Sequence, residues 1–426
     1  MSRAGEIAAR SGSAYVAVLA VTSLLVITGL AGIAVQRARL GTVMTQGDSA
    51  RARALAEGAV GLAMREMSEN DGWRSEMGGL WLDGGRWDGS STVSAAVEDP
   101  ADGSLTDDAS EAVRIVGTGQ VNGARQTVSA MADGIARGYR VLGSAAHAGG
   151  VMRVDSDEMS ADRALTTNTG WVGPDGGSGA SGTGTLSMDS GEDVEVGVVG
   201  WEIPSVTHLS ELLILSGTAI DYADLDGGKI DGVVLSADHN PYGDENPAGI
   251  YFIDAGGDNV EVRGSVLVAT LIVLNGGPGS KIKDDVSWAS PSDRLPSMVW
   301  DGRLEIDLKD GEKLDMDDLA GGSTWTLSGE AEVKVEGGGF IRVTTGPSDA
   351  TVERGLSGIF LSGDDTVVKE HLELEGVLIS GGTLRFDTDP VTLSEGVDYV
   401  ETPPIGMTGW YEMVLRAGSW ERVVQE

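Results

Sequence analysis

Loops rich in carboxylates are the part of this sequence that comes nearest to a chemical site. Asp221, Asp224 and Asp226 lie close together just before Gly227. Carboxylate oxygens at such spacing are typical ligands of calcium, although the D-x-[DN]-x-[DN]-G loop pattern would need an aspartate in the place of Tyr222. Two interpretations follow: solvated acidic turns, which we favour, or a speculative calcium site at Asp221, Asp224 and Asp226. Further acidic loops contain Asp315, Asp317, Asp318, Asp364 and Asp365.

Other groups that could do chemistry are sparse. The four histidines stand far apart, and none has the spacing of a metal ligand. The sequence contains no nucleophile elbow, no phosphate-binding loop and no dinucleotide-binding pattern. Cysteine is absent, which excludes disulfides, thiol catalysis and thiolate metal sites. We therefore expect a protein that is not an enzyme, that holds no cofactor unless calcium, and whose histidines are surface or turn residues: His147, His208, His239 and His371.

Charge divides the chain into two unequal parts. Residues 1–60 carry a net charge of +3, whereas the whole chain carries −36, so residues 61–426 carry −39. A field of this sign repels nucleic acid and anionic lipid headgroups, and it favours solubility or cationic counterions. Nucleic acid is therefore excluded as a partner.

An uncharged apolar run, Ser13–Val35, must position everything that follows it. As a helix it would cover roughly 35 Å at about 1.5 Å per residue, enough to cross a hydrocarbon core of about 30 Å. Apolar residues then recur at intervals of three and four, which predicts that the helix continues as an amphipathic one. The turn chemistry of Asn70, Asp71 and Gly72 predicts its end. The alternative is a plain single-span anchor followed by a stalk.

The residues before this run resemble a known leader. Arg3 and Arg10, then Gly12 and Ser13, then the apolar helix, resemble the N-terminus of type IV pilin-like proteins, more specifically the PilX/PulK-like minor pilins. The resemblance implies that a prepilin peptidase cuts after Gly12 and leaves Ser13 as the new N-terminus. Major pilins carry a glutamate at the position held here by Ala17, and its absence fits a tip or initiating subunit.

This resemblance also implies an organisation in four parts. These are a leader (1–12), a transmembrane and amphipathic helix (13–72), a small antiparallel β head (73–137) and a Gly/Asp-rich β domain (138–426). The β head is indicated by alternating segments at 91–97, 112–117 and 126–132, with a hairpin at Asn122-Gly123. Its apolar face should pack on the amphipathic half of the helix. Gly29 and Gly32 would let neighbouring membrane helices approach closely.

The region after residue 138 predicts a mostly β domain. Many strands of three to five residues alternate with Gly, Asp, Asn and Ser, and one short helical turn is expected near 206–215. Strands this short, with a loose internal repeat, favour a parallel β-helix or solenoid. A β-sandwich is the alternative. The expected fold class is therefore α+β: a long helix on a small antiparallel sheet, followed by the β domain.

The tail resembles the C-terminal regions of large PilX-like pilus assembly proteins, through segments 246–253, 295–302, 403–406 and 418–420. Together the resemblances imply a non-enzymatic minor pilin or pseudopilin, single-pass in the inner membrane, with its C-terminal bulk periplasmic or at the cell surface. Its partners would be other pilins and the prepilin peptidase. One alternative is a membrane-stalked, calcium-dependent adhesin or carbohydrate-binding module, in which Trp171, Trp201 or Trp325 stacks on a surface glycan. A polysaccharide lyase or hydrolase is a third hypothesis.

Overall fold

The computed structural model describes most of the chain and divides it into two compact units. It describes residues 4–70, 72–88, 91–174, 176–189, 191, 193–309, 314–315, 332–335, 339–342, 351–352, 355–387 and 390–423. Unit 1 comprises Met1–Ile135 and Tyr411–Glu426, and unit 2 comprises Ala136–Trp410. Unit 2 is therefore inserted into unit 1, and the chain returns to unit 1 for its last residues.

Unit 1 is built on one very long helix, α1 (Ala4–Glu69). The predicted helix is confirmed, and it ends where the turn residues indicated, with the amide of Asn70 donating to the carbonyl of Glu66 at 2.9 Å. It begins earlier than expected, so residues 4–12 of the proposed leader are also helical. A short helix, α2 (Trp73–Glu76), follows.

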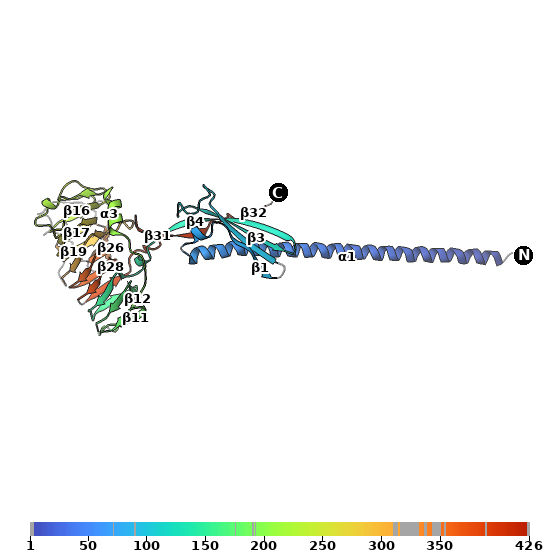
Figure 1. Cartoon of the computed structure of the whole chain (residues 1–426), viewed down its shortest axis with the longest axis horizontal. Helices are drawn as coiled ribbons and strands as arrows, with labels where there is room; N and C mark the ends of the chain where they lie inside the picture. The colour runs from blue at the N-terminus through green and yellow to red at the C-terminus, as the bar shows by residue number, and fades with distance from the viewer. Residues whose placement is uncertain are drawn as a thin grey trace. The chain divides into compact units, whose positions relative to one another are not determined.

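An antiparallel sheet packs on the C-terminal half of α1 (Figure 1). Its strand order is β1-β2-β3-β4-β31, and β32 also pairs with β4. The Asn122-Gly123 hairpin between β3 and β4 is confirmed, with φ of 47° and 90° at its two residues. The strands are β1 (Gly79–Asp88), β2 (Ser91–Glu98), β3 (Val113–Val121), β4 (Ala124–Gly138), β31 (Thr408–Leu415) and β32 (Glu421–Arg422).

Small residues bring the helix and the sheet unusually close. Alternate residues of β2 and β3 are buried, as expected for a sheet with one covered face. In β3 this face carries Gly117 and Gly119, and a Cβ atom built at either would lie 2.1 Å from a carbonyl oxygen of α1. The facing side of the helix consists of small and apolar buried residues: Ala52, Ala56, Ala59, Val60, Ala63 and Met67.

Unit 2 is the predicted mostly β domain, and its strands stack in parallel ladders. In the first ladder each strand pairs in parallel with the next. Such pairing does not fit the antiparallel β-sandwich alternative. In stacking order the first ladder is β13 (Thr218–Ala219), β16 (Ile250–Asp254), β18 (Thr270–Leu274), β20 (Met298–Trp300), β26 (Gly355–Ser362), β28 (Leu372–Ser380), β5 (Ala146–Ala148), β8 (Leu165–Thr167) and β12 (Asp193–Val198).

Two further parallel ladders complete the layers. The second comprises β14 (Lys229–Asp231), β17 (Glu261–Val268), β19 (Lys281–Ala289), β21 (Leu304–Asp307), β27 (Thr366–Val368), β29 (Leu384–Phe386), β6 (Val151–Val154) and β9 (Gly170–Val172). The third adds β15 (Val234–Ser236), β30 (Val391–Ser394) and β7 (Met159–Ala161) to parts of β17, β19, β26 and β28.

The remaining strands lie outside these ladders. Two strands pair antiparallel with the last strands of the ladders: β10 (Ser178–Gly179) pairs with β9, and β11 (Gly182–Ser187) pairs with β12. A separate four-stranded sheet contains β22 (Leu314–Asp315), β23 (Glu332–Val335), β24 (Gly339–Arg342) and β25 (Thr351–Val352).

The first ladder is covered on both faces, which explains its continuous apolar strands. Side chains such as Tyr251 and Phe360 point into the central core of unit 2. Their neighbours Ile250 and Ile359 belong to a second core cluster, together with residues of α3 (Val206–Ile214). The predicted helical turn is thus confirmed, and it forms the outer cover of this ladder.

The chain does not follow the stack from one end to the other. It enters at β5, which lies next to β28, runs outward through β8 to β12, crosses by way of α3, and starts again at β13. Figure 1 shows the result, with β11 and β12 following β28 in the stack although they precede it in sequence. Both ends of unit 2 therefore lie within the stack, where the amides of Gly138 and Tyr139 donate to the carbonyls of Val400 and Met407.

The structure places the histidine of β5 differently from the expectation of a surface residue. His147 is fully buried, and its Nδ1 lies 2.8 Å from Oγ1 of Thr166. Burial lowers its pKa to about 4. A neutral ring with a hydroxyl partner is a core residue, so the expectation was wrong for His147 because β5 is covered on both faces and all three of its residues are buried.

Candidate membrane and assembly interface

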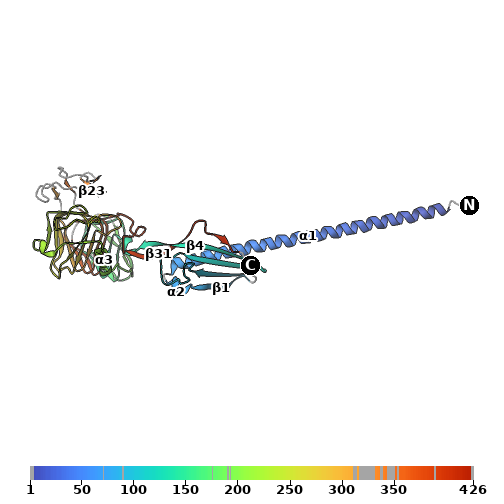
Figure 2. The same cartoon turned by 90° about the horizontal axis from the view of Figure 1, so that it is seen from above.

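The N-terminal part of α1 is apolar and is not covered by the described part of the chain. From Tyr15 to Gly47 every residue is exposed, and Figure 2 shows this part of the helix extending past the sheet of unit 1. The helix is long and apolar enough to cross a membrane. Its exposed large side chains include Leu24, Leu25 and Ile27, each at least 62% exposed.

The predicted packing residues lie on this free part. Ala17 is exposed, and a Cβ atom added at Gly29 or Gly32 would meet nothing within 4 Å. The two glycines are therefore free to admit a neighbouring helix. Gly12 and Ser13 lie inside α1, and processing at this peptide bond stays a prediction.

A second apolar feature lies beyond the arginines Arg37 and Arg39. Leu40, Val43 and Met44 are 63%, 64% and 71% exposed. Their spacing of three and four residues places them on one face of the helix. Because they follow the charged end of the predicted span, the hydrocarbon core would not cover them.

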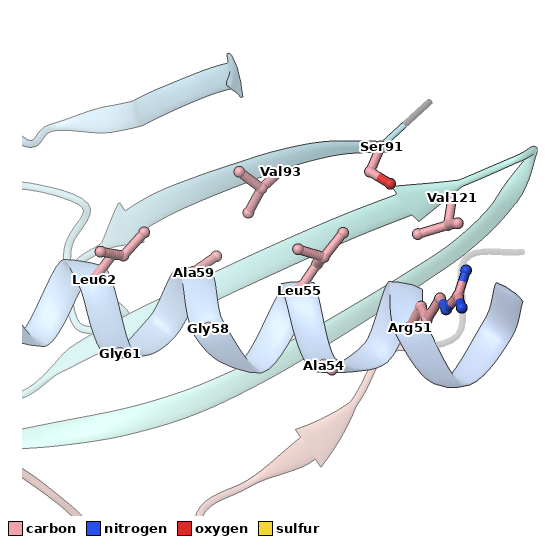
Figure 3. Close-up of a pocket in the computed structure, with 10 residues that line it drawn as sticks. All are labelled: Arg51, Ala54, Leu55, Gly58, Ala59, Gly61, Leu62, Ser91, Val93 and Val121. Carbon is pink, nitrogen blue, oxygen red and sulfur yellow. The ribbon is translucent and has the colours of Figure 1, made fainter. Parts of the chain in front are cut away.

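An apolar groove of about 540 Å³ continues this surface along unit 1. It lies between α1 and strands β2 and β3, with Leu55 and Leu62 facing Val93 and Val121 (Figure 3). Arg51 marks its end nearest the free part of the helix.

The carboxylates singled out in the sequence are spread over one turn. Asp221 caps the short helix η2 (Tyr222–Asp224), where its Oδ1 accepts from the amide of Ala223 at 3.0 Å. Asp224 and Asp226 are exposed. These three do not belong to the carboxylate group that converges in the described part of the chain, and calcium binding by them stays a prediction. Asp317 and Asp318 lie outside the described residues.

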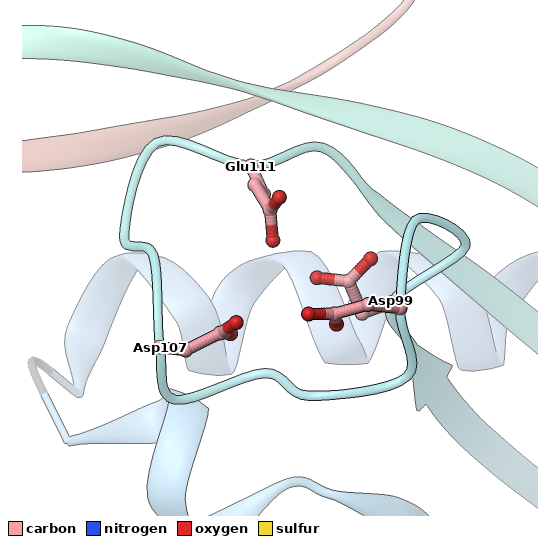
Figure 4. Close-up of side chains that lie close together, drawn as sticks. Asp99, Asp107 and Glu111 are labelled. Carbon is pink, nitrogen blue, oxygen red and sulfur yellow. The ribbon is translucent and has the colours of Figure 1, made fainter.

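A different group of acids does converge, and sequence reasoning missed it. Asp99, Asp102, Asp107 and Glu111 each bring one oxygen within 4.8 Å of the others, and Figure 4 shows three of them pointing toward one another. A side-chain hydrogen bond with Asp99, burial and the neighbouring negative charges raise the pKa of Glu111 to about 7. The signal available in the sequence was the density of aspartates and turn residues between two strands.

The tryptophans considered for sugar stacking have packing roles where they are described. Trp171 is partly buried against the core of unit 2, and its ring lies over Gly179 and Gly184. Trp201 is partly buried, and its amide and carbonyl are both bonded to the side chain of Asn168. Trp325 lies outside the described residues.

Comparisons with known proteins add little to this geometry. No family model and no curated protein sequence matches the chain. Among solved structures, one resembling it is the competence-associated pilin ComZ from Thermus thermophilus, with a TM-score of 0.27 and 11% identity, over 89% of this chain and 98% of that chain. A TM-score this low does not establish a common fold.

Proposed function

We propose that this chain is a non-enzymatic minor pilin- or pseudopilin-like subunit, PilX/PulK-like in organisation. It would assemble through α1 into a type IV pilus or a related secretion apparatus. Unit 2, which we propose to be a parallel β-solenoid on the strength of its layered parallel ladders, would be displayed on the periplasmic or outer side. The partners would be other pilin-like subunits, with prepilin peptidase acting once on the leader.

The observation that carries this proposal is the apolar stripe of Leu40, Val43 and Met44. These side chains are exposed in the isolated chain, and they lie outside the predicted span, where lipid tails would not cover them. A contiguous row of apolar groups along an otherwise unpacked helix marks a contact with another protein. A plain membrane anchor would need no such stripe beyond its charged flank.

The second half of α1 supports the same proposal. Here the helix is fixed to the sheet by close packing at Gly117 and Gly119, so α1 and the sheet form one body. A force or a contact applied to the N-terminal half of the helix is thereby transmitted to the sheet of unit 1. The exposed side of this half carries the ion pairs Arg53–Glu57 and Arg65–Glu69, both 2.8 Å long, at the four-residue spacing that lets opposite charges meet on a helix.

Leader cleavage gives the first test. We expect the protein purified from its native membrane to begin at Ser13, because the resemblance places the peptidase site after Gly12. Peptide mass spectrometry of the N-terminus measures this directly. A chain that still begins at Met1 or Ser2 would contradict processing and leave a plain anchor.

Helix packing gives the second test. We expect the double substitution Gly29→Leu and Gly32→Leu to keep membrane insertion but to reduce cross-linking to neighbouring subunits roughly tenfold, the effect of about 1.4 kcal/mol in association. The yield is measured in native membranes with a photo-cross-linker at Met44. Since both sites are open within the chain, the fold itself should not suffer.

Ala34→Leu is the matched control for this pair. It adds the same kind of bulk to the same apolar segment, but on a part of the helix circumference turned away from both glycines. Its cross-linking should stay within twofold of the unmodified protein. Equal cross-linking in the glycine double variant and the control would contradict the assigned helix contact.

The stalked carbohydrate-binding alternative lacks a comparable observation. It needs aromatic rings displayed as flat platforms, whereas Trp171 and Trp201 are packed against the core of unit 2. The lyase or hydrolase hypothesis needs acids and bases converging in a groove. Asp231, Glu261 and Asp284 do converge in unit 2 with Arg263, Lys283 and Lys309, but these six side chains form ion pairs with one another. The two grooves found in the described part of the chain lie in unit 1 and are not lined by them.

A further inference from the structure

The loop between β2 and β3 is shaped by its own carboxylates. Oδ1 of Asp99 accepts from the amide of Ala101 at 2.6 Å, and Oδ1 of Asp102 accepts from the amide of Ser104 at 2.8 Å. Asp108 is used in the same way by Ser110. These turns fold the segment back on itself, which brings the acids at its two ends together.

The convergence leaves buried oxygens without donors. Asp99 is only 6% exposed, and its Oδ2 has no hydrogen-bond partner. Oε2 of Glu111 is likewise buried and without a partner. Figure 4 shows both carboxylates directed toward the space shared with Asp107. Burying carboxylate oxygens that lack donors is costly. Either a proton shared between Asp99 and Glu111 or a bound cation lowers this cost, and the four acids together offer a cation more oxygens than a proton needs.

The nearest cation does not fill this role. The guanidinium of Arg74 donates to the carbonyls of Leu105, Ala109 and Glu111, at 2.8–3.0 Å, and its Cζ lies 4.6 Å from the ring centre of Trp73. The hydrogen bonds of its two terminal nitrogens thus go to the backbone of the loop and to Sδ of Met413 rather than to the carboxylates. Arg74 holds the loop in shape and leaves the four acids to face one another.

We propose that Asp99, Asp102, Asp107 and Glu111 bind a calcium ion. The four ligand atoms lie within 4.8 Å of one another, which matches two opposite ligands each about 2.3–2.6 Å from calcium. All four are hard oxygen donors, and neither histidine nor cysteine takes part, so zinc and copper are disfavoured. Magnesium demands a tighter octahedron at about 2.0–2.1 Å and keeps most of its water.

The exposure of the four residues suits ion entry. Asp99 lies at the bottom and is buried, whereas Asp102 and Asp107 are exposed at the rim. An ion can therefore reach the buried oxygens from solvent and keep water on its outer side. Binding would join the two ends of the loop through the metal, and would add to the hold that Arg74 already has on its middle.

Calcium titration of the full chain tests the proposal. The protein is purified in detergent, stripped with chelator and titrated with calcium chloride at about 0.15 M salt, a concentration that screens diffuse binding to the acidic surface. Hydrogen exchange measured by mass spectrometry follows the peptide that contains residues 99–111. We expect one ion per chain, a dissociation constant on the order of 10⁻⁴ M or tighter, and slowing of exchange in this peptide by roughly tenfold or more.

Variants separate this loop from other acids. Asp99→Asn and Glu111→Gln should each weaken binding by roughly tenfold or more, since each removes a charged ligand. Asp108→Asn removes a charge of the same loop outside the group but keeps the oxygen that accepts from Ser110, and Asp224→Asn lies in the turn of unit 2; both should leave the affinity within twofold. Circular dichroism shows whether each variant keeps its fold. If one of the two ligand variants fails to fold, the other still tests the site.

Three outcomes would overturn the proposal. They are calcium binding by Asp99→Asn and Glu111→Gln at the affinity of the unmodified protein, unchanged exchange of residues 99–111 on calcium addition, and equal protection by magnesium at the same concentration. None of these readouts depends on assembly, so the calcium site and the pilin-like function stand or fall separately.

Discussion

Replacing Gly117 by valine should detach α1 from the sheet and destabilise unit 1 by about 3 kcal/mol or more. A Cβ atom at this position would lie 2.1 Å from the carbonyl oxygen of Ala56 and 3.1 Å from Cγ2 of Val60. The obstacle is helix backbone, which cannot rotate away as a side chain can. Overpacking of a core typically costs about 1–3 kcal/mol, and a rigid backbone neighbour places this case at or above the upper end.

Pulse proteolysis in increasing urea, followed on peptides from β2 and β3, measures this loss. Thr118→Val is the control, because Thr118 lies next in the strand, faces the opposite side and has a single partner, Oγ1 of Thr127 at 3.1 Å. It should cost about 1 kcal/mol. Similar midpoints for the two variants would show that the helix does not approach the sheet at Gly117 as described.

An aspartate at Leu25 should abolish stable membrane insertion. Leu25 lies near the middle of the apolar run, and its side chain is 62% exposed. Exchanging a leucine for an aspartate at the centre of a span costs about 3–4 kcal/mol on insertion scales, more than a single span with several glycines and threonines can absorb. Alkaline extraction of membranes should find most of the Leu25→Asp protein in the soluble fraction, and the unmodified protein in the pellet.

Met44→Asp separates insertion from the mere addition of charge. Met44 is on the same helix and 71% exposed, but it lies beyond Arg37 and Arg39, outside the predicted span. This variant should pellet like the unmodified protein. If Met44→Asp is released as well, the membrane segment extends further than the run Ser13–Val35; if Leu25→Asp stays in the pellet, the run is not what holds the chain in the membrane.

Elements whose bounds depend on a few neighbouring residues could be predicted from the sequence. The end of α1 at Glu69, the hairpin at Asn122-Gly123 and the helical turn that became α3 all follow from capping, turn preference and periodicity over a few residues. The packing of the amphipathic half of α1 on the sheet followed from the same periodicity. These features need no knowledge of distant parts of the chain.

Long-range pairing could not be predicted in the same way. Tyr251, Leu271, Met298, Phe360 and Leu378 hold the same place in successive layers, but the chain lengths between them differ widely, so no fixed period appears in the sequence. The assignment of everything after residue 138 to one domain failed to foresee that Tyr411–Glu426 pairs back into unit 1. Nothing within the last strands themselves reveals a partner almost three hundred residues earlier.

The candidate sites divide along the same line. Gly29 and Gly32 were identified because they are small residues within a continuous apolar run, a signal that is local to the sequence. The group formed by Asp99, Asp102, Asp107 and Glu111 was missed because it depends on how Arg74 draws the loop backbone together, and Arg74 lies in another element. Asp221 and its neighbours were considered as calcium ligands because of their spacing in the sequence, whereas in the structure the side chain of Asp221 caps η2.

The insertion of unit 2 between β4 and β31 sets the order in which the protein can be completed during its synthesis. β31 and β32 leave the ribosome only after residues 136–410, a delay on the order of tens of seconds at about 5–20 residues per second. Throughout this time β4 is an unpaired sheet edge, the kind of surface that recruits foreign strands. A nascent chain that stalls within unit 2 is therefore expected to expose the free edge of β4 to proteases and chaperones even after α1 and the first four strands have folded.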